Sequence, residues 1–257
     1  MSESIALTVD LEPDWGIEGA RAYREVTPKF LRFIEERGIT ATFFIVSDLL
    51  DTAREPVAAI AERNEVASHG CSHRLLSRLG AGEALEELRR SRLRLQEFGK
   101  PVRGFRAPFF ARAPGHFALL RKAGYCYDAS MGSVLPGPHN GRLSLLDSPS
   151  RREGVYEFST CAACCGLAPF SLTYLRLLAP VAAKCLSDSP SLLYLHLHEF
   201  LPPQTAACLP LPLRRVLTRN CGRKAWDILD RTLTALGGKL RCCGEILDDA
   251  REKHRGN

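Results

Sequence analysis

Two histidines four residues apart, His69 and His73, have a spacing typical of metal ligands. They lie in the segment EVASHGCSH (residues 65–73), just after a short apolar run. If a helical turn begins here, side chains at positions i and i+4 share one face, about 5–6 Å apart, and can bind one divalent ion. Two polar histidines in a loop are the alternative interpretation. Other segments must decide between the two.

Three carboxylates follow the first apolar run of the chain. Residues 5–11 (IALTVDL) have the pattern of a strand, and Asp10, Glu12 and Asp14 lie at its end or just beyond it. Because side chains alternate along an extended strand, Asp10 and Glu12 point to the same side. One of these two acids can therefore bind a metal while the other acts as a base.

Three later hydrophobic runs also end in chemically competent side chains. The first ends at Arg106, the second at Asp128 and the third at His196 and His198. In barrel enzymes the functional residues lie at the C-terminal ends of parallel strands. We therefore expect these side chains to meet at one end of the fold.

Together and in this order, the five segments resemble the polysaccharide deacetylase family, the NodB-like carbohydrate esterases. The start of the first family motif is similar to the Thr-Val-Asp that ends at Asp10. This resemblance implies that Asp10 is the catalytic base. The second motif, His-x-x-x-His, matches His69 and His73 and implies that both bind the metal. The five segments extend from about residue 5 to residue 200, which is most of the chain.

The third and fourth motifs imply roles for residues in the middle of the chain. The third motif, Arg-x-Pro, matches Arg106 and Pro108, and it implies that Arg106 orients the catalytic aspartate. The fourth motif resembles the segment YDAS at Asp128. The resemblance makes Pro108 and Asp128 candidate substrate contacts.

The last motif distinguishes between His196 and His198. The family branch that this chain resembles most closely reads Tyr-x-His-Pro-Trp-Glu, which aligns with the segment YLHLHE (residues 194–199). The alignment implies that His196 is the general acid. His198 then replaces an aromatic residue and is expected to be a packed neighbour or a substrate contact.

One departure from the family pattern concerns the third metal ligand. The common pattern has a second aspartate directly after the first, but this chain has Leu11, which cannot bind a metal. Some branches have the ligand two residues on, which favours Glu12 and agrees with the strand alternation. Pro13 could instead turn Asp14 toward the metal, because proline fixes its own φ and restricts the residue before it. Glu12 and Asp14 both remain candidates.

The resemblance implies a hydrolase that uses a divalent metal ion, most simply zinc, to remove the N-acetyl group from an amino sugar in a polysaccharide or glycolipid intermediate. Two alternatives share the same motifs. One is another amide hydrolase on the same scaffold, such as a sugar deformylase or a ureide hydrolase. The other is a catalytically inactive sugar-binding protein, for which Leu11 is the only support.

The order of strand-like and helix-like segments predicts an α/β protein. We expect a distorted seven- or eight-stranded (β/α) barrel, formed as a single domain over residues 1–257. Residues 132–170 lack helical periodicity and are expected to form loops with short strands along one wall of the cleft. The expected strands lie near 5–10, 40–46, before His69, before Arg106, 125–128 and 239–243, and the helices near 21–37, 52–63, 82–98, 114–123 and 245–253.

The composition is that of a globular protein, with 45% hydrophobic and 25% charged residues. We see neither a signal-peptide pattern nor an apolar run long enough to cross a membrane, which predicts a cytoplasmic protein. The ten cysteines are then expected to be reduced. The cluster of Cys161, Cys164 and Cys165 fits small buried side chains better than a zinc site, which usually needs two paired spacings.

The net charge of +6 is concentrated toward the C-terminus, where eleven lysines and arginines lie between residues 214 and 255. A solvated helical face is the simplest interpretation. An anionic partner is the alternative, either the phosphates of a lipid-linked or nucleotide sugar or an anionic membrane surface. No nucleic-acid-binding motif accompanies the charge. The oligomeric state stays open.

Overall fold

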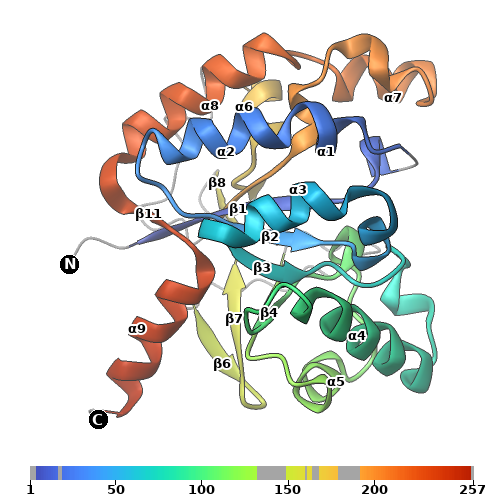
Figure 1. Cartoon of the computed structure of the whole chain (residues 1–257), viewed down its shortest axis with the longest axis vertical. Coiled ribbons are helices and arrows are strands. Elements are labelled where there is room, and N and C mark those ends of the chain that lie inside the picture. The colour runs from blue at the N-terminus through green and yellow to red at the C-terminus, as the bar shows by residue number, and fades with distance from the viewer. Residues whose placement is uncertain are drawn as a thin grey trace.

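A curved, mostly parallel sheet forms the centre of the computed structural model (Figure 1). The structure describes residues 4–16, 19–131, 149–159, 161–163, 168–178 and 192–255. The strand order is β10-β1-β2-β3-β4-β5-β7-β6, and β11 pairs with β1. The strands are β1 (Ile5–Leu11), β2 (Thr42–Ile45), β3 (Glu65–Ser68), β4 (Gly104–Phe105), β5 (Tyr127–Met131), β6 (Ser150–Arg152), β7 (Val155–Ser159), β10 (Leu192–His196) and β11 (Leu240–Arg241), with a separate pair β8 (Cys161–Ala163) and β9 (Ala168–Pro169).

Helices lie between most of these strands and pack around the sheet. Parallel pairing requires such crossovers, because a hairpin can join only antiparallel strands. Figure 1 shows α1, α2 and α8 along one side of the molecule and α4 and α5 along another. The helices are α1 (Arg21–Glu25), α2 (Thr27–Glu35), α3 (Leu50–Arg63), α4 (Ala81–Gln96), α5 (His116–Ala123), α6 (Leu172–Leu178), α7 (Leu211–Leu217), α8 (Arg223–Leu236) and α9 (Cys243–Arg255).

The expected distorted barrel is confirmed in the form of a curled half-barrel. Along the eight-strand path every pairing is parallel except that of β6 with β7. Among the described residues, β10 and β6 lie at opposite ends of the path, so the sheet stays open there. Within the described part of the chain, the helices are too short or too polar to span a membrane.

The register of the parallel strands brings the chemically competent residues to one end of the sheet. Asp10 lies opposite His196 of β10. Ser68, the residue before His69, lies opposite Phe105, the residue before Arg106. The strand ends therefore meet as the spacing of the motifs predicts.

Both faces of the sheet are buried, as the alternating side chains of β1 show. All seven residues of this strand are buried. Leu7, Val9 and Leu11 pack with the surrounding helices in the main hydrophobic core. Because side chains alternate, Thr8 and Asp10 point to the opposite, inner face. Leu11 therefore points away from the face that carries Asp10 and belongs to the core.

The helix expected over residues 21–37 is in fact two helices, α1 and α2, separated at Val26. Pro28 lies in the first turn of α2. Proline has no N–H to donate, and its ring clashes with the carbonyl group four residues earlier, so it starts a helix well and interrupts one badly. The break follows from this residue.

Of the expectation for residues 132–170, the short strands are confirmed as β6 to β9, but the described residues of this range do not form a wall of the cleft. β7 is a strand of the central sheet, parallel to β5, and β6 joins it through a hairpin whose two loop residues, Glu153 and Gly154, both have positive φ. This loop conformation matches the twist of paired strands. The described residues 149–159 do not line the pocket described below, and residues 132–148 lie outside the described part.

Gly104 allows β4 and β5 to pack closely. A Cβ atom at this position would lie 2.0 Å from Cζ of Tyr127, whose buried ring crosses the glycine. We expect Gly104→Ala to lower the free energy of unfolding by about 3 kcal/mol, because an overpacked core forces backbone shifts. Urea unfolding measures this loss.

Gly82 is the matched control for that substitution. It lies in α4, and a Cβ atom there meets nothing within 4 Å. Alanine is the better helix former by about 1 kcal/mol, so Gly82→Ala should leave stability unchanged or raise it. Equal stability of the two variants would contradict the close packing of Gly104.

Candidate active site

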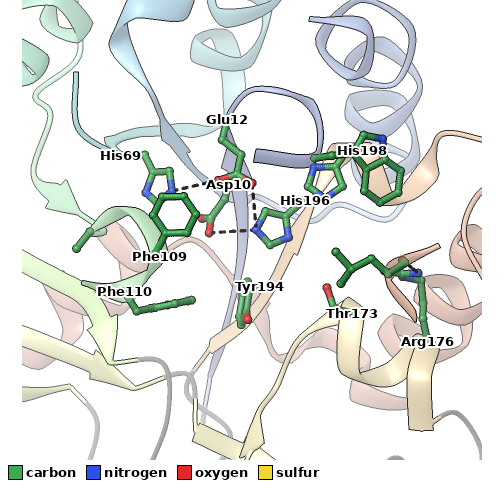
Figure 2. Close-up of a pocket in the computed structure, with 13 residues that line it drawn as sticks. Asp10, Glu12, His69, Phe109, Phe110, Thr173, Arg176, Tyr194, His196 and His198 are labelled. Carbon is green, nitrogen blue, oxygen red and sulfur yellow. Dashed lines mark hydrogen bonds and ion pairs between the residues drawn. The ribbon is translucent and has the colours of Figure 1, made fainter. Parts of the chain in front are cut away.

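A pocket of about 300 Å³ opens at the C-terminal ends of β1, β3 and β10 (Figure 2). Its size suits a small ligand. Carboxylates and imidazoles lie on its floor, and aromatic side chains form its walls. The lining residues are Asp10, Glu12, Trp15, His69, Ala107, Phe109, Phe110, Thr173, Arg176, Tyr194, His196, His198 and Leu217.

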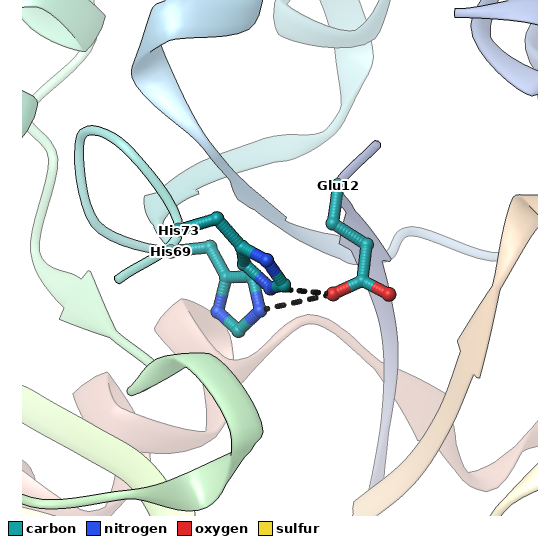
Figure 3. Close-up of side chains that lie close together, drawn as sticks. All are labelled: Glu12, His69 and His73. Atoms are coloured by element: carbon teal, nitrogen blue, oxygen red, sulfur yellow. Dashed lines mark ion pairs between the residues drawn. The ribbon is translucent and has the colours of Figure 1, made fainter. Parts of the chain in front are cut away.

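Glu12, His69 and His73 converge beside this pocket, as Figure 3 shows. Each offers one potential ligand atom, and the three atoms lie within 4.8 Å of one another. Oε2 of Glu12 is 2.7 Å from Nε2 of His73 and 3.7 Å from Nε2 of His69. Two imidazoles and a carboxylate are a donor set of catalytic zinc sites.

The backbone that carries the two histidines is a loop, so the helical turn considered from the sequence was wrong. Gly70 has a φ of 81° and His73 a φ of 57°, both in the left-handed region. The N–H groups of Cys71 and Ser72 donate to Oε1 of Glu87, at 2.9 and 2.7 Å. A side chain from α4 thus satisfies this backbone in place of helical hydrogen bonds.

The orientation of both imidazoles fits a bound cation. Nδ1 of His69 lies 2.8 Å from the backbone carbonyl oxygen of Arg106. A carbonyl oxygen can only accept, so Nδ1 donates to it, and Nε2 is the ring nitrogen that faces Glu12 and would bind a cation. Within the part of the chain that the structure describes, the buried Nε2 of His73 makes no hydrogen bond of good geometry, despite its short distance to Glu12.

The Glu12 carboxyl is ionised in this setting. Burial alone would raise its pKa, but the positive charge of His196 and the neighbouring His69 and His73 hold the pKa well below its usual range. A divalent cation bound between this buried negative charge and the two ring nitrogens would neutralise the charge and offset the cost of burying it.

Asp14, the alternative third ligand, lies apart from the histidines. Its carboxylate accepts hydrogen bonds from the N–H groups of Arg21 (2.7 Å) and Ala22 (3.1 Å) at the start of α1. It therefore caps a helix, and the geometry selects Glu12 as the carboxylate of the cluster.

Asp10, which lines the pocket, forms a buried ion pair with Arg106. Nη1 of Arg106 donates to Oδ1 of Asp10 at 2.5 Å, and both side chains are almost fully buried. The guanidinium also donates to Thr8 and to the carbonyl oxygen of Ala129, both at 3.0 Å. It lies over the ring of Phe44, at 4.1 Å from the ring centroid. These contacts fix Oδ1, while Oδ2 of Asp10 faces His196 at 3.9 Å.

His196 lies opposite the metal-ligand cluster and is held by acids on both sides. Its Nε2 is 3.7 Å from Oε1 of Glu12, and its Nδ1 is 3.4 Å from Oε1 of Glu199. Burial lowers its pKa, but the charges of Glu12, Glu199 and Asp10 outweigh burial and raise the pKa to about 9. The imidazole is therefore protonated at neutral pH.

Glu199 is anchored in turn by Arg176. Nε of Arg176 donates to Oε2 of Glu199 at 2.7 Å, and Thr173 donates to the same oxygen at 3.1 Å. Burial would raise the pKa of Glu199, but His196 and Arg176 lower it to about 2. Thus Glu199 stays charged and keeps the His196 ring in place.

His198 differs from His196 in charge and in contacts. Its ring stacks on His196, with centroids 4.9 Å apart and planes at 16°, and contacts Trp15 at 4.6 Å. Burial and the charge of His196 lower the pKa of His198 to about 4. A neutral ring in a stack fits the expected packed neighbour or substrate contact.

Two predicted substrate contacts, Pro108 and Asp128, do not line the pocket. Pro108 packs against Gly70 beneath the histidine loop. Asp128 is fully buried, accepts a hydrogen bond from Ser130 at 2.5 Å and lies 3.1 Å from Nε2 of His116. Both residues therefore support neighbouring segments and, as placed here, do not reach the pocket.

The aromatic walls were missed by the sequence interpretation. Phe109 is 48% exposed at the pocket and packs on His73, with ring centroids 4.8 Å apart. Among the described residues, six non-glycine residues have positive φ, and four of them surround this site: Trp15, His73, Phe109 and Phe110. Strained backbone often marks functional sites. The only local signal for these walls in the sequence was that Trp15, Phe109 and Phe110 lie next to the predicted motifs.

The predicted cysteine cluster cannot be placed, because the side chains of Cys161, Cys164 and Cys165 lie outside the described part. The described Cys242 and Cys243, far from the pocket at the start of α9, are buried free thiols. Burial raises the pKa of Cys242 to about 12, which fits an unreactive packed thiol.

Solved structures of carbohydrate esterase family 4 are similar to this chain in fold, and none of the curated proteins matches. A pseudoenzyme of this family from Bacillus anthracis shares 12% identity over 96% of this chain, with a TM-score of 0.59, and this chain covers 66% of that one. A family 4 domain of a multidomain xylanase from the hindgut metagenome of Trinervitermes trinervoides shares 16% identity (96% and 91% covered, TM-score 0.56). The peptidoglycan deacetylase PdaC from Bacillus subtilis shares 15% identity (99% and 94% covered, TM-score 0.54).

At these identities the solved structures show a shared fold. The sequence match is narrower and falls on the N-terminal half of the chain, where residues 2–127 match the family described as Polysaccharide deacetylase. That segment contains Asp10, Glu12, both histidines and Arg106. The sequence match over residues 2–127, the fold and the site agree, and together they relate this chain to the polysaccharide deacetylase family.

Proposed function

We propose that this protein is a metal-dependent hydrolase that removes the N-acetyl group from an amino sugar in a polysaccharide or glycolipid intermediate. The convergence of Glu12, His69 and His73 beside the Asp10–Arg106 pair and the protonated His196 supports this proposal most directly. A ligand set, a base and an acid then face one pocket, as hydrolysis of an amide requires.

Glu12, His69 and His73 would hold the cation, for which zinc suits the ligand types. When bound, a divalent zinc ion polarises the amide carbonyl and makes a nearby water more acidic. The cluster borders the pocket, so an amide group bound there would lie beside these three side chains and Asp10.

Asp10 is placed to accept the proton of the attacking water at Oδ2. Its other oxygen is held by Arg106, which keeps the carboxylate oriented. Because Arg106 is also bound to Thr8 and the Ala129 carbonyl, it cannot turn toward the substrate instead. Arg106 therefore acts as a positioning residue for the base.

His196 is placed to donate the proton that the departing amine needs. Its Nε2 faces the pocket between Glu12 and Asp10, while Nδ1 faces Glu199. An amine is a poor leaving group unless it is protonated, so this transfer allows the C–N bond to break. The stack with His198 limits rotation of the ring.

The aromatic walls suit a sugar ring. Trp15, Phe109, Phe110 and Tyr194 line the same pocket as the polar floor. Apolar and aromatic walls with a few placed polar groups are typical of small-molecule sites. The pocket thus supports an amino sugar as the substrate.

The environment of Leu11 favours catalysis over an inactive binding protein. Leu11 packs in the main core, and Glu12, one residue later, places its carboxylate beside the histidines. A carboxylate therefore stands in the ligand cluster although the family's usual aspartate is missing. The argument for lost catalysis from Leu11 is correspondingly weak.

The direct test is acetate release from N-acetylated glucosamine oligomers by the zinc-loaded protein. We expect turnover that is abolished by a chelator and restored by zinc, and Asp10→Asn should lower turnover by about 10²- to 10⁴-fold even with zinc bound. Formate release from an N-formylated analogue without any acetate release would assign the deformylase activity instead. Tight zinc binding without hydrolysis of any amide substrate would contradict an enzymatic function.

A further inference from the structure

The short helix α7 exposes three apolar side chains, of which Leu213 and Val216 share one face, and basic residues lie beside them. Of the seven large hydrophobic side chains that are exposed in the described part of the chain, three lie on this seven-residue helix: Leu211 (58%), Leu213 (47%) and Val216 (51%). No residue of α7 is buried. Such a face is costly to leave in water and marks an interaction surface.

The chain segment that contains α7 carries charge of a single sign. Residues 201–226 contain no aspartate or glutamate and five basic residues, a net charge of +5 for the segment: Arg214, Arg215, Arg219, Arg223 and Lys224. Apart from the half-buried Arg214, these side chains are exposed. Apolar side chains flanked by arginine and lysine match an anionic lipid surface. The apolar side chains insert among the lipids, and the anionic headgroups attract the basic side chains.

The helix is firmly connected to the active site. Leu217, its last residue, lines the pocket and packs on a small hydrophobic cluster that contains Trp15. The carbonyl oxygens of Leu217 and Arg219 accept hydrogen bonds from Nη1 of Arg176, at 3.0 and 2.6 Å. Arg176 also anchors Glu199. Anything that binds the exposed side chains of α7 would therefore lie next to the wall of the pocket.

We propose that Leu211, Leu213 and Val216, with the five basic residues of segment 201–226, form a docking surface for a bilayer that contains anionic phospholipid. In this arrangement α7 lies along the lipid headgroups, and the pocket opens beside them. A substrate carried on a lipid would then reach the pocket from the bilayer; this consequence, unlike the docking itself, rests on the proposed function.

Co-sedimentation with vesicles tests the apolar part of the surface. The intact protein should bind vesicles of phosphatidylcholine with phosphatidylglycerol, and bind pure phosphatidylcholine at least tenfold more weakly. Leu213→Ser/Val216→Ser should lose this binding. Leu93→Ser is the matched control, because Leu93 is 65% exposed on α4, and it should bind like the unmodified protein.

The charged part is tested by Arg215→Glu/Arg219→Glu, with Arg89→Glu on α4 as the control. Each arginine near an anionic surface is worth about a fivefold change in binding, so the double variant should bind at least tenfold more weakly. High salt should weaken binding of the unmodified protein in the same way. Equal binding by the α7 variants and their controls would overturn the proposal.

The same experiments distinguish a bilayer from other partners of the α7 surface. Binding of the unmodified protein to DNA or RNA but not to vesicles, or an α7-dependent dimer in gel filtration without vesicle binding, would also overturn the proposal. Acetate release from a soluble oligosaccharide is measured in parallel, and the α7 variants should retain it. Vesicle binding without any turnover would contradict the proposed function and leave the docking surface intact.

Discussion

Glu12→Gln is expected to lower the affinity for zinc by at least about 100-fold, because loss of even an outer-shell partner of a metal ligand costs 10- to 100-fold. His69→Ala and His73→Ala should have effects at least as large, since each removes a ring nitrogen of the cluster. All three variants should lose turnover. Zinc titration, combined with elemental analysis of the purified protein, measures the loss.

Asp14→Asn is the matched control for Glu12→Gln. Its carboxylate binds backbone N–H groups at the start of α1 and lies apart from the histidines. The substitution should therefore leave zinc affinity unchanged and cost at most about 1 kcal/mol of stability, the usual worth of a helix cap. Should Asp14→Asn release zinc while Glu12→Gln retains it, the third ligand would be Asp14.

Asp10→Asn and His196→Ala are each expected to lower kcat by about 10²- to 10⁴-fold, the usual contribution of a positioned base or acid. Both variants should retain zinc, because neither residue belongs to the cluster of potential ligands. Retained zinc with lost turnover separates proton transfer from metal binding. Steady-state kinetics on zinc-saturated protein provides the measurement.

The pH profile gives a second and independent result for His196. The acid must be protonated, so the rate should fall as the pH rises through the pKa of His196. Its neighbours raise this pKa to about 9, and Glu12 contributes the largest upward shift. A cation bound to Glu12 offsets that negative charge, so the alkaline limb is expected below pH 9.

His196→Ala should remove the alkaline limb, although coupled groups titrate as a set. His198→Ala is the control, because a pKa of about 4 leaves His198 without the acidic second proton of an imidazolium at neutral pH. A large loss of rate in His198→Ala, with an unchanged profile in His196→Ala, would assign the acid to His198.

The sequence alone determined most of the residues with a chemical function. Asp10, His69 and Arg106 end separate hydrophobic runs, and parallel strands bring such ends together whatever the details of the loops. The register of β1 with β10 and of β3 with β4 shows the same result in space. Periodicity and strand-end position are local properties, so a single sequence carries them.

The tertiary structure decided what depends on contacts between distant segments. The choice of Glu12 over Asp14 follows from where α1 begins, since its first N–H groups bind Asp14. The loop of His69 and His73 is shaped by a glutamate of α4. Neither partner is visible in the local pattern of the motif.

The support of His196 illustrates the same limit. Arg176 lies in α6, 23 residues before Glu199, and no motif marks it. The side chain of Arg176 reaches Glu199, and through it supports His196, only because α6 packs beside β10. The sequence therefore determined which residues can perform the chemistry, and the packing of distant helices determined which of them are held, charged and aimed at one pocket.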